Sequence, residues 1–128
     1  MTAAPATRVV LVVDDDAQVR SLLVRWAHTT GMHAIVADGG EDALLAFADH
    51  PEIDAVITDV AMPGLDGPTL ATRLRAMRPS LPLVFISGFT GLTENPDVQL
   101  RPRATFVAKP FSLQALSAAL AAVLVETA

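Results

Sequence analysis

Short apolar runs recur along the chain, and longer segments with an apolar residue at every third or fourth position separate them. The runs are rich in Val, Ile, Leu and Phe and show little alternation with polar residues. That pattern is typical of strands buried on both faces of a parallel sheet. The predicted strands are Val9–Val13, His33–Ala37, Ala55–Thr58, Leu83–Ser87 and Thr105–Ala108.

Helical spacing fills the intervals between these runs. Gly31, Pro51 and Pro79 end the first three helical segments, and Ser112 is the predicted N-cap of the last. Alternating strands and helices with short connections predict an α/β fold with right-handed crossovers. The apolar positions that define the helices are Val19, Leu22, Leu23 and Trp26; Ala43, Leu44 and Phe47; Leu70, Leu74 and Met77; and Leu113, Leu116, Leu120 and Leu124.

One segment departs from the pattern. Residues 88–103 should hold the helix between the last two strands, but they contain two glycines, two prolines and poor apolar spacing. We expect the fourth helix to be short or irregular, around residues 92–100. A single domain is expected over residues 8–126, after a flexible N-terminal segment of residues 1–7.

Composition narrows the classes of function. The chain has 128 residues, of which 52% are hydrophobic and 18% charged, and this balance predicts one folded domain. A net charge of −5 without a basic stripe argues against nucleic-acid binding. The absence of cysteine excludes disulfides and thiolate metal sites. The apolar C-terminal stretch is about half of the roughly 20 residues that a membrane span needs, so we expect a soluble cytoplasmic protein.

Polar side chains stand where four of the five predicted strands end. Ligands of open α/β sheets bind beyond the carboxyl ends of the strands, so these side chains should share one edge. They are Asp14, Asp15 and Asp16 after the first strand, Asp59 after the third, Ser87 at the end of the fourth and Lys109 after the fifth.

Such a cluster predicts a cation site. Neighbouring carboxylates repel one another unless a cation joins them, and oxygen ligands without cysteine or paired histidines favour Mg²⁺. Mg²⁺ beside a lysine and a hydroxyl is an environment for phosphoryl transfer, in which one carboxylate can be the nucleophile. Lys109 is the only lysine beside eight arginines, and its compact ammonium suits a single phosphoryl oxygen. We also expect a cis peptide bond between Lys109 and Pro110.

Four strings in register, "VLVVDDD", "ITDVAMPGLDG", "VFISG" and "FVAKPF", resemble the receiver domain of two-component response regulators. The resemblance covers essentially the whole chain. It implies a flavodoxin-like, doubly wound, five-stranded parallel sheet of order 2-1-3-4-5 with helices on both faces. It also implies a phosphorylation switch and not an enzyme with its own substrate, apart from intrinsic autophosphorylation and autodephosphorylation.

The resemblance assigns roles to residues of this sequence. Asp59 would accept the phosphoryl group from a histidine kinase or a histidine phosphotransfer protein. Asp15 would bind Mg²⁺ directly and Asp14 largely through water, with Asp59 and the backbone carbonyl of Ala61 as further ligands.

Ser87 and Phe106 would form the switch. Ser87 would bind one phosphoryl oxygen, and the rotamer of Phe106 would follow the movement of Ser87. Lys109 would pair with another phosphoryl oxygen. The downstream protein partner is unknown, and a homodimer is possible. Since no output domain follows the last predicted helix, we expect a stand-alone receiver or a piece of a larger protein.

The sequence departs from the family pattern at three places. Asp16 stands where glutamate is most common, Gly88 where alanine is common, and Arg103 where glycine is usual. The "SGF" and "KPF" strings resemble receivers attached to hybrid sensor kinases.

Several residues also have ordinary structural explanations. Asp16 and Asp66 are expected to cap helices, and Trp26 is expected to pack in the core. Phe106 can also be a plain core aromatic, and the two roles are compatible. No metal-ligand spacing is found at His28, His33 or His50.

Two other functions compete with the switch. A pseudo-receiver would bind partners without phosphate, although the full set of acids, hydroxyl and lysine argues against it. An aspartate-dependent phosphatase would need a D-x-D nucleophile motif after the first strand and a cap domain, which "DDDA" and the short chain fit poorly. Flavin binding fails because three carboxylates after the first strand would repel a phosphate.

Overall fold

The computed structural model describes residues 7–87 and 103–124. One sheet of five parallel strands has the order β2-β1-β3-β4-β5, which confirms the predicted fold class and strand order. The strands are β1 (Val9–Val13), β2 (His33–Ala37), β3 (Ala55–Asp59), β4 (Leu83–Ser87) and β5 (Ala104–Ala108).

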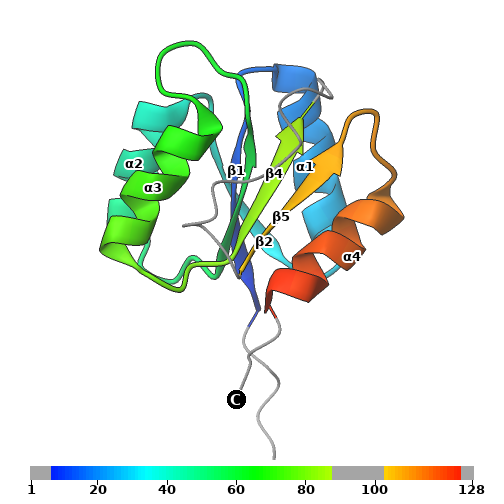
Figure 1. Cartoon of the computed structure of the whole chain (residues 1–128). Coiled ribbons are helices and arrows are strands. Elements are labelled where there is room, and N and C mark those ends of the chain that lie inside the picture. Colours follow the sequence, from blue (N-terminus) through cyan, green and yellow to red (C-terminus); the bar gives the residue numbers. More distant parts are fainter. Residues whose placement is uncertain (1–6, 88–102, 125–128) are drawn as a thin grey trace, which may run out of the picture.

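Helices cover both faces of this sheet (Figure 1). One face packs against α2 and α3, and the other against α1 and α4. The strand β1 shows why: Leu11 and Val13 enter one apolar core, whereas Val10 and Val12 enter the other, and all four are fully buried. The uninterrupted apolar runs of the sequence therefore mark strands with two cores. The helices are α1 (Ala17–Thr29), α2 (Gly40–Asp49), α3 (Gly67–Met77) and α4 (Leu113–Leu124).

The predicted helix boundaries are confirmed by their caps. The Asp16 carboxylate accepts a hydrogen bond from the backbone N–H of Gln18 at 2.9 Å, and Asp66 accepts one from Thr69 at 2.8 Å. At the start of α4, the Ser112 hydroxyl oxygen accepts from the N–H of Ala115 at 3.0 Å. Gly31, just beyond α1, has a φ of +79°, a conformation that glycine adopts without strain.

Two strand boundaries differ slightly from the prediction. The strand β3 includes Asp59, because this residue pairs with Ile86 of β4. The strand β5 begins at Ala104, which pairs with Leu83. In both cases backbone pairing extends the strand by one residue beyond the predicted range.

Other predictions fall outside the described residues. These are the flexible N-terminal segment, except Thr7, and the short helix around residues 92–100. Within the described ranges, no helix combines the length and the apolar character that crossing a membrane requires.

The first and last helices are joined by the only tryptophan. Trp26 is 2% exposed, and its indole N–H donates a hydrogen bond to the Ser117 hydroxyl oxygen at 2.9 Å. This contact links residues far apart in sequence and confirms that Trp26 is a packing residue.

Three arginines lie at the end of the sheet where the strands begin, and their guanidinium groups donate to backbone carbonyls. Arg103 donates three hydrogen bonds, Arg75 two and Arg78 two. The guanidinium of Arg78 also lies over the Phe47 ring, 4.7 Å from its centroid. The accepting carbonyls are those of Val123, Ser80 and Leu124 for Arg103, Leu81 and Arg103 for Arg75, and Ile53 and Pro51 for Arg78.

Candidate functional site

The carboxyl ends of two neighbouring strands bring three carboxylates together. Asp14 follows β1, Asp59 ends β3, and these strands pair with Val13 opposite Thr58. One carboxylate oxygen from each of Asp14, Asp15 and Asp59 can be chosen so that all three lie within 4.8 Å of one another. Asp14 and Asp59 are buried, whereas Asp15 is exposed, so the group is open on one side. The adjacency of β1 and β3 thus creates an acidic site from distant parts of the sequence.

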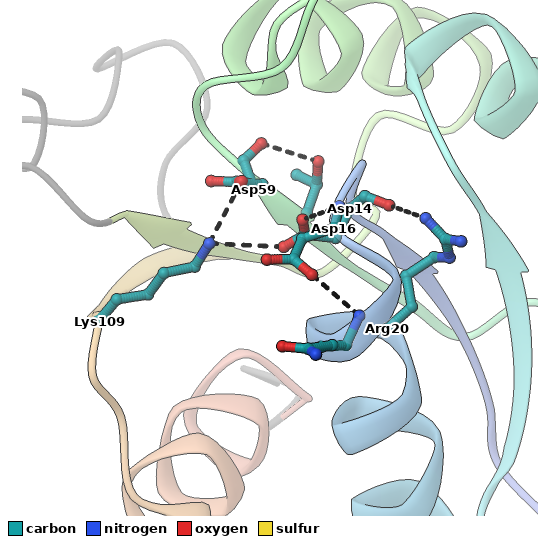
Figure 2. A network of polar contacts seen from close by, with 7 residues as sticks. Asp14, Asp16, Arg20, Asp59 and Lys109 are labelled. Carbon is teal, nitrogen blue, oxygen red and sulfur yellow. Dashed lines mark hydrogen bonds and ion pairs between the residues drawn. The ribbon is translucent and has the colours of Figure 1, made fainter.

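Lys109 reaches into this site from β5. Its Nζ lies 3.4 Å from Oδ2 of Asp59 and 3.6 Å from Oδ2 of Asp14, and Figure 2 shows the ammonium joined to both carboxylates. The backbone N–H of Lys109 donates to the carbonyl of Ser87 at 2.8 Å, which holds the end of β5 against β4. The Lys109–Pro110 peptide bond is cis, as expected.

The loop after β1 is held by its own polar groups (Figure 2). Oδ1 of Asp14 accepts a hydrogen bond from the N–H of Asp16 at 2.8 Å. The backbone carbonyl of Asp14 accepts a hydrogen bond from Nη1 of Arg20 at 2.7 Å. The backbone N–H of Asp14 donates to the carbonyl of Ala37 at 3.2 Å. The contact of Arg20 was not expected from the sequence, where Arg20 is one of several arginines on a helical segment.

The Asp14 carboxylate is the buried charge that this arrangement destabilises most. Its Oδ2 is buried and, within the described part of the chain, accepts no hydrogen bond, although Lys109 is near. Burial raises the pKa of Asp14, and the negative charge of Asp59 adds to this, while the hydrogen bond from Asp16 and the charge of Lys109 act against it.

These features fit a divalent cation with oxygen ligands. Three carboxylates cluster beside one ammonium, so negative charge is in excess, and one buried carboxylate oxygen accepts no hydrogen bond from the residues that the structure describes. A cation placed among the carboxylates would relieve both the repulsion and the burial of charge. Oxygen ligands with an open, solvent-facing side suit Mg²⁺, which keeps part of its water shell. Ala61, the predicted carbonyl ligand, lies in the loop two residues after Asp59.

The two predicted switch residues lie on β4 and β5. Ser87 is the last residue of β4, is 2% exposed and pairs with Ala108, the residue before Lys109. Phe106 is half-buried and pairs with Phe85, and the two ring centroids are 5.2 Å apart. Packing of Phe106 against the core is therefore confirmed, and its part in switching stays a prediction.

Other candidate groups lie apart from this cluster. Asp16 caps α1, as predicted, and is not one of the three clustered acids. Among the residues that the structure describes, the histidines do not belong to a metal-type cluster. His50 instead pairs with Glu52 on the surface at 3.0 Å.

Comparison with known proteins gives a family match over most of the chain. The model of the response regulator receiver domain matches residues 10–121. The response regulator receiver protein CpdR of Brucella abortus is 34% identical over 107 residues, covering 84% of this chain and 88% of CpdR. The sensor kinase CckA of the same organism is 35% identical over 109 residues, but the match spans only 12% of CckA.

Solved structures agree with the sequence match. The CheX–CheY–BeF₃–Mg²⁺ complex from Borrelia burgdorferi contains a chain similar to this one, with a TM-score of 0.82 and 27% identity. The similarity covers 93% of this chain and 90% of the other. The arrangement of strands and helices is therefore shared with proteins of this kind over nearly the full length.

Proposed function

We propose, since the chain belongs to the family of response regulator receiver domains, that it is a phosphorylation-dependent signalling switch with Asp59 as the phosphoacceptor. The single observation that carries the proposal is the position of the Lys109 ammonium, 3.4 Å from Asp59 and 3.6 Å from Asp14. The proposed acceptor Asp59, the neighbouring Asp14 and the Lys109 ammonium come from the ends of three strands and meet at one edge of the sheet.

The phosphoryl group would come from a phosphorylated histidine of a sensor kinase or of a phosphotransfer protein. A carboxylate oxygen of Asp59 attacks the phosphorus, the new oxygen–phosphorus bond forms, and the bond from phosphorus to the histidine nitrogen breaks. Lys109 then pairs with a phosphoryl oxygen instead of with the free carboxylates, and Ser87 donates its hydroxyl to another.

Mg²⁺ bound at this edge would neutralise charge on the phosphoryl oxygens. Asp14, Asp15, Asp59 and the carbonyl of Ala61 are the proposed ligands. The buried Oδ2 of Asp14 supports this set, because it is close to Lys109 but accepts no hydrogen bond within the described residues. The presence of BeF₃ and Mg²⁺ in the CheX–CheY complex supports the same chemistry for a similar chain.

Phosphorylation would alter the surface near β5. The doubly charged group draws Ser87 toward the site, and Phe106, which packs on Phe85, moves into the space released. A protein partner then distinguishes the two states. As a member of this family, the chain would also take phosphoryl groups from small donors and lose them by hydrolysis. We propose that it acts in the cytoplasm. Similarity to CpdR favours a stand-alone receiver, and similarity to CckA favours a receiver from a hybrid kinase.

The test is direct phosphorylation. The chain is incubated with acetyl phosphate and Mg²⁺, and its mass is measured by electrospray ionisation. We expect a gain of one phosphoryl group that is lost in Asp59→Asn and kept in Asp66→Asn, which changes an exposed helix cap instead. A chain that gains no mass, and does not bind beryllofluoride with Mg²⁺, would be a pseudo-receiver, and the proposal would be wrong.

A further inference from the structure

The first residue of α3 lies unusually close to the phosphoacceptor. A Cβ atom added to Gly67 would stand 2.3 Å from the backbone oxygen of Asp59, 3.0 Å from Cα of Val60 and 3.2 Å from the carbonyl carbon of Asp59. All three are backbone atoms at the buried end of β3, where Asp59 and Val60 are each 6% exposed. A backbone cannot move aside as the tip of a flexible side chain can.

From this contact we infer that Gly67 is a positioning residue for Asp59. Because it has no side chain, α3 can start directly against the peptide that follows the phosphoacceptor and hold that peptide in one orientation. The direction of the Asp59 carboxylate, and the path of the loop toward Ala61, follow from this orientation. The inference rests on the proposed function, since Gly67 would act only through Asp59.

Hydrogen bonds make the contact rigid. The N–H of Gly67 donates to the carbonyl of Val60 at 2.9 Å, and the N–H of Val60 donates to Ile86 of β4 at 2.9 Å. The Thr58 hydroxyl donates to the same Asp59 carbonyl that Gly67 approaches, at 3.0 Å. Helix start and strand end are therefore joined, and a displacement of one is passed to the other.

The buried face of α3 restricts movement of the helix away from β3. Leu70, Ala71 and Leu74 are fully buried in the core shared with α2. A methyl group at position 67 would need about 1 Å of separation, and an active-site displacement of that size can lower a rate about 100-fold. Part of this displacement should reach the Asp59 carboxylate.

The experiment compares rates of phosphoryl uptake from acetyl phosphate at saturating Mg²⁺, with every variant shown to be folded by circular dichroism. We expect Gly67→Ala to take up the phosphoryl group roughly 10- to 100-fold more slowly than the unmodified chain. The amide resonances of Asp59 and Val60 should move in its nitrogen–proton spectrum.

Two controls separate positioning from loss of stability. Leu74→Ala removes a fully buried side chain from the same helix, so it should lower the melting temperature but keep the rate. Gly39→Ala adds a methyl group where nothing lies within 4 Å, and it should keep the rate, with only the small loss of stability expected for alanine at the N-cap of α2. If Gly67→Ala does not fold, Thr58→Val removes the hydroxyl that donates to the Asp59 carbonyl and should slow uptake several-fold.

A rate equal to that of the unmodified chain in Gly67→Ala would overturn the inference and leave the proposed function standing. The same holds for Thr58→Val where Gly67→Ala fails to fold. Equal slowing in Leu74→Ala would also overturn it, because the effect would then follow stability. If the unmodified chain takes up no phosphoryl group from acetyl phosphate, the proposed function is overturned, and the inference with it.

Discussion

The two ends of the sheet use charged side chains in opposite ways. Where the strands begin, three arginines direct their guanidinium groups at backbone carbonyls of loops and of a helix end. Where the strands end, three carboxylates cluster, one ammonium lies near two of them, and a buried carboxylate oxygen accepts no hydrogen bond within the described residues. One end satisfies its polar groups with the protein's own atoms. The other carries an excess of negative charge, which is where we propose that Mg²⁺ binds.

This difference separates stability from function along one axis of the molecule. Carbonyls that accept from arginine stabilise the fold, because a hydrogen bond from a charged donor lowers the free energy of the folded chain. Crowded carboxylates destabilise the folded chain until a cation or a phosphoryl group joins them. We therefore expect mutations at the two ends to change the free energy of unfolding in opposite directions.

The largest effect is expected at the arginine end. Arg103→Ala leaves the carbonyls of Val123, Ser80 and Leu124 without this donor and should lower the free energy of unfolding by about 2–4 kcal/mol. Urea denaturation measures it, with Arg73→Ala, an exposed arginine of α3, as control. Phosphorylation of the folded variant should proceed at the normal rate. A loss no larger than that of the control would contradict the comparison.

The next effect is stabilisation by the proposed cation. Mg²⁺ at ten times its dissociation constant should raise the free energy of unfolding by about 1.4 kcal/mol, because it binds only the assembled site. Thermal unfolding with and without Mg²⁺ at constant ionic strength measures this. Asp15→Asn should remove most of the increase. An equal increase in that variant would place the cation elsewhere.

A smaller effect of opposite sign to the first is expected at Asp14. Burial raises the pKa of Asp14 above its ordinary value of 3.8, so the folded chain holds this proton to higher pH than the unfolded chain does. Stability is then lost as pH rises between the two pKa values and stays lost at neutral pH. Asp14→Asn avoids that loss and should raise the free energy of unfolding by roughly 1 kcal/mol at pH 7 without Mg²⁺.

The control for that variant is Asp16→Asn, which keeps an N-cap and carries no buried charge. The advantage of Asp14→Asn should shrink as pH falls toward the ordinary value. A variant that is less stable than the unmodified chain at neutral pH would show that the ion pair with Lys109 outweighs burial.

The smallest effect sharpens the comparison, because it concerns an arginine at the acidic end. Arg20 donates one hydrogen bond, to the Asp14 carbonyl. Arg20→Ala should lower the free energy of unfolding by about 0.5–1 kcal/mol, less than Arg103→Ala, since fewer carbonyls lose a donor. Arg25→Ala on the exposed side of α1 is the matched control. An effect as large as that of Arg103 would mean that the two ends do not differ in this respect.

The sequence predicted the parts of the fold that depend on local pattern. Uninterrupted apolar runs identified the strands, and Asp16, Asp66 and Ser112 identified the starts of three helices, because a cap bonds to a backbone N–H only two or three residues away. Strand order came from the family resemblance. Apolar runs alone do not say which strand lies beside which.

Contacts of long range were the part that sequence could not supply. The acidic site was predicted because parallel strands deliver their ends to one edge, a rule that needs no side-chain detail. The sequence did not predict that Arg103 donates to backbone carbonyls, because an arginine side chain can reach many of them. It did not predict the close approach of Gly67 to Asp59, because that contact can be recognised only when the neighbouring backbone is known. "GLDGP" showed a helix start but not the strand against which the helix begins.

The bond between Trp26 and Ser117 gives the molecule a built-in optical probe. Indole emission depends on the polarity and the hydrogen bonding around the ring, and this ring senses how the last helix sits on the first. A change in its wavelength when Asp59 is modified would reveal that the signal has crossed to the helix pair on that face. A constant spectrum would confine the rearrangement to the neighbourhood of the modified carboxylate.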